Sequence, residues 1–310
     1  MQRFLVLALV VPLLAGRAEA QSLRDNFDGG DLDETKWMVK QVRDDQISFP
    51  ASGRCGAGIE ITVRESDGGK QCDTDCQRAE VRTIPGSWPT FGDEVWYGFS
   101  FRVSGDIAEI GSRRFVVGQW KGPGDDSPML AQRFDNGVFH ITVQDNDVRY
   151  VVASAEGDPD AIESARQEMG GQELAEPLGD LPAAVHGSAP GESLTHPGIK
   201  IIREPNAMLP DPRKGWVDMV YRVKPGRMDN EYGARRAGEI DVWANGRKIV
   251  SVRGNIGATL KNDNPLPLKG PYFKFGIYRL RQPGTVRFSF DEFSQAPRRD
   301  MLAGLCKTTR

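Results

Sequence analysis

The chain has 310 residues, with 40 lysines and arginines against 43 aspartates and glutamates and a formal net charge of −3 at neutral pH. Such a near-balance argues against a nucleic-acid-binding protein, which would show a basic excess or a basic stripe. The length is large for one domain, but all-β sandwiches commonly exceed ~200 residues as a single unit.

Residues 1–20 have the pattern of a signal peptide. An arginine precedes an apolar run from Phe4 to Ala15, and Ala18 and Ala20 offer small side chains at the positions that a signal peptidase reads. This run is too short to span a bilayer, and no other stretch approaches the ~20 apolar residues that a spanning helix requires. We therefore predict a secreted or periplasmic protein with no membrane partner, whose mature chain, residues 21–310, is a single domain.

Alternating apolar and polar residues recur along the chain and predict half-buried strands with one wet face. Asn245-Gly246 divides two such strands and predicts a hairpin. Long helical periodicity is nearly absent, so we predict an all-β protein, an antiparallel sandwich or barrel. The clearest alternating segments are Ile59–Val63, Val95–Val103, Phe139–Val143, Val217–Val223, Glu239–Trp243, Lys248–Val252 and Val286–Phe290.

Four cysteines, Cys55, Cys72, Cys76 and Cys306, occur in a chain that we expect to be exported. In that setting disulfides are favoured over metal ligands or a catalytic thiol. The segment between Cys72 and Cys76 could turn tightly enough to bridge them, which would leave Cys55 with Cys306. The other two pairings stay open.

Residues 154–214 interrupt the alternation. They are rich in glycine, proline, alanine and acidic residues, and only Asp160–Met169 predicts a short amphipathic helix. Loops beyond ~15 residues are uncommon inside a compact domain. Two interpretations of this loop-rich insertion stay open: a lid over a groove, and a mobile surface insertion.

The segment Tyr272–Arg279 is the most informative in the chain. At the two-residue period of a strand, Tyr272, Lys274 and Tyr278 share one face, and the phenylalanines and the isoleucine take the other. Gly276 lies between the last two polar residues and leaves room for a ring to approach the backbone. Such a face suits a flat, anionic, cyclic ligand such as a uronic acid, while the alternative is a ladder that only stabilises the sheet.

Three further segments place polar side chains on one face of a predicted strand. An arginine beside a glutamate on a strand is oriented, although such a pair taken alone would be interpreted as a surface ion pair. The combination of segments indicates a site. Its residues are Arg78, Glu80 and Arg82; Gln119 and Lys121; and His140.

The motifs Arg78-Ala79-Glu80, Gln119-Trp120-Lys121 and Tyr272–Tyr278, in this order, resemble those of the jelly-roll polysaccharide lyases, the group that includes heparin lyase I, glucuronan lyases and, more distantly, alginate lyases. The segments around Trp37 and Trp216, the Asn245-Gly246 hairpin and the closing Phe290–Phe293 are also similar. The resemblance covers most of the chain apart from the insertion. It implies a concanavalin-like β-jelly-roll sandwich of two antiparallel sheets.

Lyases of this group cleave uronate chains by β-elimination, which removes the C5 proton and expels the oxygen at C4. The resemblance implies that Arg78 and Gln119 neutralise the carboxylate, by the logic of an oxyanion hole, and that Tyr278 supplies the acid and also the base. Lys274 would favour the phenolate of Tyr278. The implied substrate-binding residues are Lys274, Tyr272, Glu80, Arg82, His140 and Arg279.

This chain has Lys121 where the lyase pattern has histidine. As a base, Lys121 would need a pKa far below the reference value of about 10.4. As a cation it would help to neutralise the carboxylate, and we favour this role because it requires less perturbation. His140 is the other candidate for the missing base.

The resemblance implies a monomer that acts on an acidic polysaccharide and needs no cofactor. It allows a structural calcium ion with Asp28 or Asp291 as a contributor. Two other classes compete: a non-catalytic module that binds acidic glycans, and a laminarinase-like glycoside hydrolase that uses Glu239 and Asp241. Hydrolysis requires two carboxyl groups around the bond, and Ala244, or Trp243 if no bulge is counted, stands where the second glutamate would be.

Overall fold

A computed structural model describes residues 22–41, 43–67, 76–107, 114–122, 127–135, 137–145, 148–156, 193–196, 198–205, 207–228, 235–257 and 270–305. The predicted signal peptide and the predicted helix at residues 160–169 lie outside the described residues. In the described part of the chain, no helix is long and apolar enough to cross a membrane.

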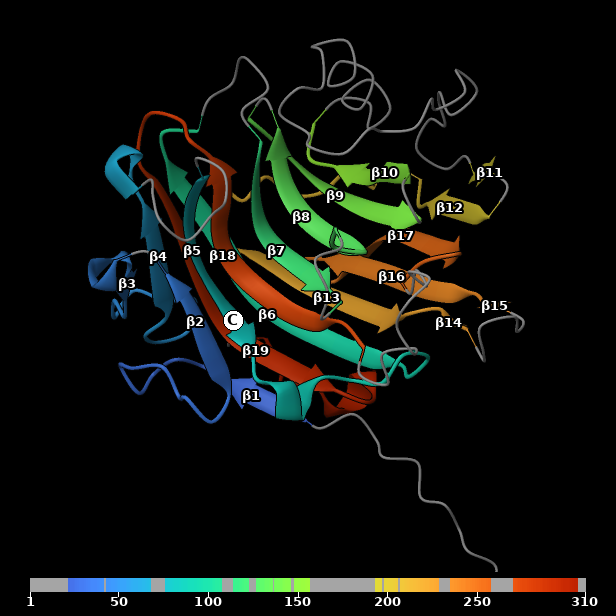
Figure 1. Cartoon of the computed structure of the whole chain (residues 1–310), viewed down its shortest axis with the longest axis horizontal. Coiled ribbons are helices and arrows are strands. Elements are labelled where there is room, and N and C mark those ends of the chain that lie inside the picture. Colours follow the sequence, from blue (N-terminus) through green and yellow to red (C-terminus); the bar gives the residue numbers. More distant parts are fainter. Residues whose placement is uncertain are drawn as a thin grey trace, which may run out of the picture.

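The described residues form two large antiparallel sheets packed face to face, with one small two-stranded sheet beside them (Figure 1). This confirms the predicted β-jelly-roll sandwich. The first large sheet has ten strands. They are β11 (Ser193–His196), β12 (Ile199–Arg203), β17 (Arg247–Gly254), β16 (Gly238–Ala244), β13 (Val217–Lys224), β6 (Val95–Gly105), β19 (Val286–Ala296), β4 (Ile59–Val63) and β3 (Ile47–Ser48) in spatial order, with β1 (Leu23–Asp25) paired to β19.

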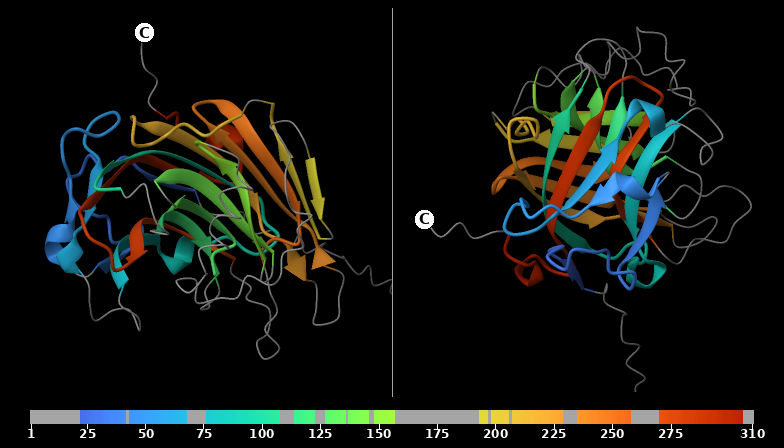
Figure 2. Two further views of the ribbon diagram at one scale, coloured as in Figure 1. Left: turned by 90° about the horizontal axis from the view of Figure 1, so that it is seen from above. Right: turned by 90° about the vertical axis from the view of Figure 1, so that its left-hand side faces the viewer.

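The second large sheet has seven strands, and the small sheet pairs β14 (Arg227–Met228) with β15 (Arg235–Arg236). The two large sheets bend in the same direction, with the seven-stranded sheet on the inner side of the bend, so its outward face is concave (Figure 2). Its strands in spatial order are β10 (Val148–Ser154), β9 (Val138–Asp145), β8 (Leu130–Asp135), β7 (Phe115–Lys121), β18 (Tyr272–Leu280), β5 (Cys76–Thr83) and β2 (Trp37–Gln41).

Strand alternation produces the core. In β13, Val217, Met219, Tyr221 and Val223 are all buried and their neighbours are only half-buried. Aromatic rings join the sheets: Phe275 of β18 stacks on Phe290 of β19 with ring centroids 3.9 Å apart. Buried apolar side chains of this size stabilise a fold by roughly 1.5–3 kcal/mol each, so the core fixes how the two sheets pack.

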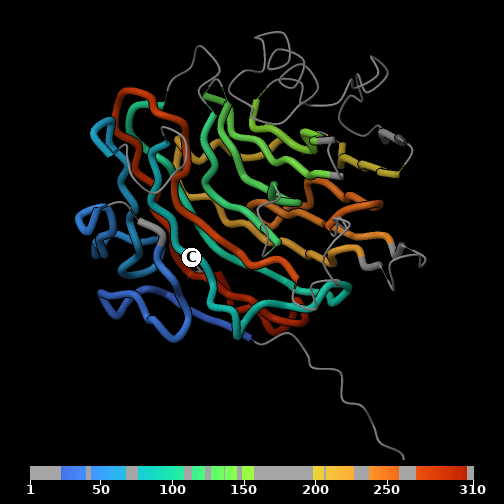
Figure 3. Tube along the Cα trace, in the orientation of Figure 1, coloured from blue at the N-terminus to red at the C-terminus, as the bar shows by residue number. Residues whose placement is uncertain are grey.

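One hairpin turn and one strand pairing explain how the chain closes. Asn245 and Gly246 both have positive φ, 47° and 77°, which is the requirement of the type I′ hairpin turn, and the predicted hairpin is confirmed. The N-terminal β1 pairs with the C-terminal β19 (Figure 3). Short 3₁₀ turns occur at Asp44–Gln46, Glu65–Asp67, Pro85–Ser87 and Arg299–Met301.

Part of the predicted loop-rich insertion, residues 154–214, is sheet. Strands β11 and β12 extend the ten-stranded sheet, and Ile199 and Ile201 of β12 are buried. The alternation in β12 is only five residues long, so the surrounding glycines and prolines obscured it.

Cys55 and Cys76 are each disulfide-bonded. Cys72 and Cys306 lie outside the described residues, and the pairing of the four cysteines stays a prediction.

Candidate active site

Three neighbouring strands bring the predicted site segments together. β18 lies between β5 and β7, and its Tyr278 is opposite Arg78 while its Lys274 is opposite both Arg82 and Gln119. Ala79 and Val81 of β5 point into the core and are fully buried. The side chains that point the other way from β5, β18 and β7 form what we call the site face, on the concave side of the seven-stranded sheet.

Glu80 is the centre of the site face. The residue is 1% exposed, and its carboxylate accepts hydrogen bonds from Arg78 Nε at 2.5 Å and from Gln119 Nε2 at 2.6 Å. Lys274 Nζ lies 3.1 Å from the same carboxylate. Burial alone would raise the pKa of Glu80, but the charges of Lys274 and Arg78 outweigh burial and lower it. Glu80 is therefore a buried anion that orients three donors.

Lys274 is almost completely buried, at 3% exposure. Burial lowers the pKa of Lys274 to about 8, with Arg78 and Lys121 adding to the decrease and Glu80 opposing it. The ammonium is thus largely charged at neutral pH and easily neutralised above it. Its predicted effect on the Tyr278 phenolate stays a prediction.

Tyr278 is half-buried, unlike Glu80 and Lys274 on the same face, so its ring can be reached from outside. The Arg78 guanidinium lies over the ring, with Cζ 4.8 Å from the centroid. For Arg78, burial favours a lower pKa, but Glu80 more than compensates and raises it. Arg78 is consequently held between a carboxylate and a phenol ring.

A second aromatic and cationic group lies at the other end of the site face. Arg82 Cζ is 5.3 Å from the ring centroid of Tyr272 and 5.9 Å from that of Trp88. Trp88 was not predicted from the sequence. The sequence feature that could have indicated Trp88 is its place between two prolines shortly after a site strand, in Pro85-Gly86-Ser87-Trp88-Pro89.

Lys121 lies opposite Tyr272, whereas Val116 of the same strand lies opposite Tyr278. Lys121 therefore belongs to the end of the site face that holds Arg82, and its charge acts on Lys274.

The sequence predicted that His140 lies on a solvent-exposed face, but the structure buries it. It is on β9, separated from β7 by β8, and is 2% exposed with its Nδ1 3.1 Å from the carbonyl oxygen of Val138. His140 does point away from the core between the sheets, as predicted, because its neighbours Phe139 and Ile141 point into that core. The alternation of residues could not show that the other side of the strand is covered as well.

Arg279 is also misplaced by the sequence prediction. It follows Tyr278, so the strand period turns it away from the site face, and it is 1% exposed with Nη2 donating to the carbonyl oxygen of Gly284 at 2.7 Å. Burial lowers its pKa to about 10. Arg279 is therefore a buried residue that points away from the site face, and its role in substrate binding stays a prediction.

Gly276 has a backbone role, and the approach of a ligand ring at this position stays a prediction. Its φ is +128°, and a Cβ there would overlap the carbonyl oxygen of Ala79 and the Cα of Glu80. The pairing of β18 with β7 shifts register between Phe275 and Tyr278. A β-bulge centred on glycine accounts for both observations.

Asp28 and Asp291, the residues suggested for calcium, both bind backbone N–H groups. Asp291 Oδ2 accepts the backbone N–H groups of Arg54 and Cys55, and Asp28 Oδ1 accepts that of Ala57. Within the described ranges, no group of three or more His, Cys, Asp or Glu side chains could hold a metal ion. A structural calcium ion stays a prediction.

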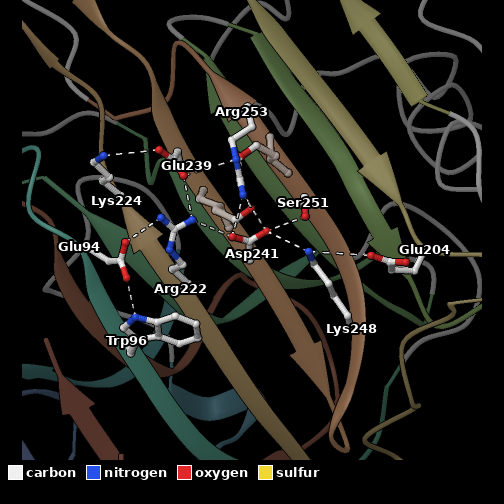
Figure 4. Close-up of polar contacts among 12 residues, drawn as sticks. Glu94, Trp96, Glu204, Arg222, Lys224, Glu239, Asp241, Lys248, Ser251 and Arg253 are labelled. Atoms are coloured by element: carbon white, nitrogen blue, oxygen red, sulfur yellow. Dashed lines mark hydrogen bonds and ion pairs between the residues drawn. The ribbon is translucent and has the colours of Figure 1, made fainter. Parts of the chain in front are cut away.

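The carboxylates suggested for a hydrolase lie on the other sheet. Glu239 and Asp241 point outward from β16 and bind Arg222 and Arg253 in a network of ion pairs (Figure 4). For both carboxyl groups burial would raise the pKa, but their hydrogen bonds and the arginines lower it. A glycosidase needs one carboxyl group that stays protonated, so this pair does not suit hydrolysis.

Fold and site face together define a jelly-roll enzyme of the polysaccharide lyase class. A family model described as polysaccharide lyase matches residues 25–294. The chain belongs to this family, which confirms the resemblance predicted from the motifs. No curated protein matches the chain.

Several solved structures are similar in fold. A family 7 alginate lyase, A1-II′, in complex with a product is 12% identical, with 84% of this chain and 95% of that chain covered and a TM-score of 0.46. Alginate lyase PA1167 from Pseudomonas aeruginosa is 15% identical, with 86% and 99% covered and a TM-score of 0.40. A cellulose induced protein, Cip1, is 14% identical, with 89% and 97% covered and a TM-score of 0.43. Likenesses this distant say nothing of the substrate.

Proposed function

We propose that the protein is an exported lyase that cleaves a uronic-acid-containing polysaccharide by β-elimination on the site face. The observation that carries this proposal is the half-buried Tyr278 against Arg78, beside donors that Glu80 holds in place. The mature chain, residues 21–310, would act as a single domain and a monomer.

Charge balance favours a carboxylate ligand. Around Glu80, the two cations Arg78 and Lys274 face one carboxylate, which leaves a formal charge of +1, and the charge of Lys121 acts on Lys274 from the Tyr272 end of the site face. The side-chain amide of Gln119 has two N–H groups, and one bond to Glu80 leaves the second for a substrate oxygen. Donors that are already oriented stabilise the enolate-like transition state without reorganisation.

Tyr278 would carry the proton transfers. The Arg78 guanidinium over its ring would stabilise the negative charge that the phenol oxygen gains after it protonates the leaving oxygen. Lys121 would act as a cation, because it lies at the Tyr272 end of the site face, away from Tyr278.

The experiment is a screen of the purified protein against uronic-acid polysaccharides for products that absorb ultraviolet light. Elimination leaves an unsaturated uronate, so we expect such a product from at least one polymer. New reducing ends without this absorbance would indicate a hydrolase. Binding without any cleavage would indicate a glycan-binding module, and either result would contradict the proposal.

A further inference from the structure

The side chains of β7 do not follow one alternation along the whole strand. Phe115 and Val117 are two residues apart and both lie in the core, so a strict two-residue period would place Gln119 in the core as well. Gln119 instead lies on the site face, where it donates to Glu80, and Trp120 takes the next place in the core. The two faces of the strand therefore exchange between Val117 and Gln119.

A β-bulge produces this exchange. The pairing of β7 with β8 shifts register between Val116 and Gly118, so Val117 has no residue opposite it on β8. One extra residue moves the later residues of a strand to the other face. The bulge thus turns Gln119 toward the concave side of the sheet, and a side chain at Gly118 would point into the core.

Gln132 occupies the space that a side chain at Gly118 would take. It lies opposite Gly118 on β8 and is fully buried, and a Cβ at Gly118 would overlap its Oε1 and lie 3.1 Å from its Cδ. In the part of the chain that the structure describes, this Oε1 is buried without a hydrogen-bond partner. A buried amide oxygen without a partner costs free energy, so hydrogen bonding alone does not explain a glutamine here.

A tyrosine of the other sheet holds the amide of Gln132 in place. Gln132 Nε2 donates to Tyr221 Oη at 2.9 Å, and Tyr221 is a fully buried residue of β13. The Tyr221 ring also packs against Trp120, with ring centroids 4.5 Å apart. Tyr221 therefore ties the bulged part of β7, and the residue that fills the bulge, to the ten-stranded sheet.

We propose that Gln132 is a positioning residue of the site face. Its amide, which Tyr221 holds, fills the space at Gly118 and stabilises the bulge that turns Gln119 toward the substrate. This inference rests on the proposed function, in which Gln119 donates to the substrate carboxylate. A donor to charge that develops in the transition state acts on kcat, so replacing Gln132 lowers kcat and leaves KM nearly unchanged.

A double-mutant cycle tests whether Gln132 acts through Gln119, with ultraviolet-absorbing product on the best polymer as the readout. Gln119→Ala removes a transition-state donor and lowers kcat about 100-fold. Gln132→Ala alone lowers kcat at least about tenfold, because a displacement of about 1 Å can cost about 100-fold. In the Gln119→Ala background, Gln132→Ala lowers kcat no further. An equal loss in both backgrounds, or a wild-type kcat in Gln132→Ala, overturns the proposal.

Gly118→Ala tests the contact from the other side. The added methyl group collides with the amide of Gln132, so kcat falls. In the double variant with Gln132→Ala the amide is absent, and kcat rises above that of Gly118→Ala alone. A double variant that is no more active than Gly118→Ala overturns the proposed contact.

Gln46→Ala is the matched control. Gln46 is also a buried glutamine, with Nε2 donating to Asp67 at 2.9 Å, and it directly precedes β3 of the ten-stranded sheet. Its replacement lowers the unfolding temperature and keeps the wild-type kcat. An equal loss of kcat in Gln46→Ala would reduce the effect of Gln132→Ala to lost stability and overturn the proposal.

A crystal structure of Gln132→Ala separates this inference from the proposed function. We expect the Gln119 amide to lie outside hydrogen-bond distance of Glu80, and an intact Gln119–Glu80 bond in the variant overturns the positioning role. A wild type that yields no unsaturated product from any polymer contradicts the proposed function instead, and this structural readout still applies. If Gln132→Ala does not fold, Tyr221→Phe, which removes only the hydroxyl that holds the amide, replaces it in both measurements.

Discussion

Lys121 stands where the lyase pattern has histidine. The register between β7 and β18 determines how far it lies from Tyr278, the proposed general acid. Lys121 lies opposite Tyr272, five residues along β7 from Val116, the residue opposite Tyr278. A cation there can act on the substrate carboxylate through space, but a base would have to reach the same C5 proton as Tyr278.

Replacing Lys121 by arginine separates these two roles. The variant keeps the charge and cannot act as a base, so we expect it to retain at least about a tenth of the wild-type kcat/KM, whereas loss of a general base costs roughly 100-fold or more. Initial rates of ultraviolet-absorbing product measure the difference. A well-folded but inactive Lys121→Arg would show that the lysine is the base.

Lys274 predicts a pH dependence. Its pKa of about 8 means that the ammonium is charged below that pH and neutral above it, and a neutral amine cannot help to neutralise a carboxylate. We expect kcat/KM of the wild type to fall as the pH rises through about 8. Lys274→Arg, whose guanidinium stays charged, should lack this alkaline limb, and an unchanged limb in the variant would exclude Lys274 as its source.

The sequence predicted most of the side chains that meet on the site face, because strand period alone decides which face a residue takes. Arg78, Glu80, Arg82, Lys274 and Tyr278 illustrate this. It could not predict that Glu80 is a buried anion that the other groups surround, since that depends on the pairing of β5, β18 and β7. His140 was expected to be exposed because alternation does not show what covers a strand. Arg279 was included with the site residues because it directly follows Tyr278 in the motif.

At the scale of elements, the bulge in β18 sets the spacing between Lys274 and Tyr278. The period-two pattern was read correctly from the sequence, but a bulge depends on how a strand meets its neighbours, and only the glycine marked it. The short strands β11 and β12 escaped prediction for a related reason: four or five residues give too little alternation to distinguish a strand from a loop.

Gly276→Ala tests the bulge. The left-handed φ and the overlap with Ala79 and Glu80 leave no room for a methyl group, so we expect a loss of about 1–3 kcal/mol in the free energy of unfolding and a fall in activity as Tyr278 shifts. Gly29→Ala is the control, because a Cβ at Gly29 has nothing within 4 Å. Equal denaturation midpoints for the two variants would show that the bulge is not strained.

At the scale of the whole molecule, the two sheets have different outward faces. The concave face carries the proposed chemistry, while the outward face of the ten-stranded sheet carries the ion-pair network around Asp241 (Figure 4). The sequence showed carboxylates in both places, and only the assignment of strands to sheets separates them. The network's charges are mutually satisfied, which is typical of a stabilising surface.

Asp241→Asn measures that stabilisation. The carboxylate accepts hydrogen bonds from Ser251, Arg253 and Arg222, so we expect a loss of about 1–3 kcal/mol in the free energy of unfolding at neutral pH. Because the pKa of Asp241 is lowered in the fold, its contribution is complete above the unfolded value of about 3.9 and is lost as the pH falls through the folded value.

The difference between wild type and Asp241→Asn should therefore shrink in strong acid. Asp300→Asn is the control, because its partner Arg298 is equally exposed and such pairs contribute about 0–1 kcal/mol. Denaturant titrations at several pH values would contradict this account if the Asp241→Asn difference did not depend on pH.

The most direct measurement of the proposed elimination is the rate of ultraviolet-absorbing product formation by the wild type and by Tyr278→Phe on the best polymer. Tyr97→Phe is the matched control, because Tyr97 is fully buried in the core. We predict that Tyr278→Phe keeps the wild-type unfolding temperature and loses essentially all product formation, while Tyr97→Phe stays active. Full activity of Tyr278→Phe would contradict the assignment of this tyrosine, and with it the proposed chemistry of the site face.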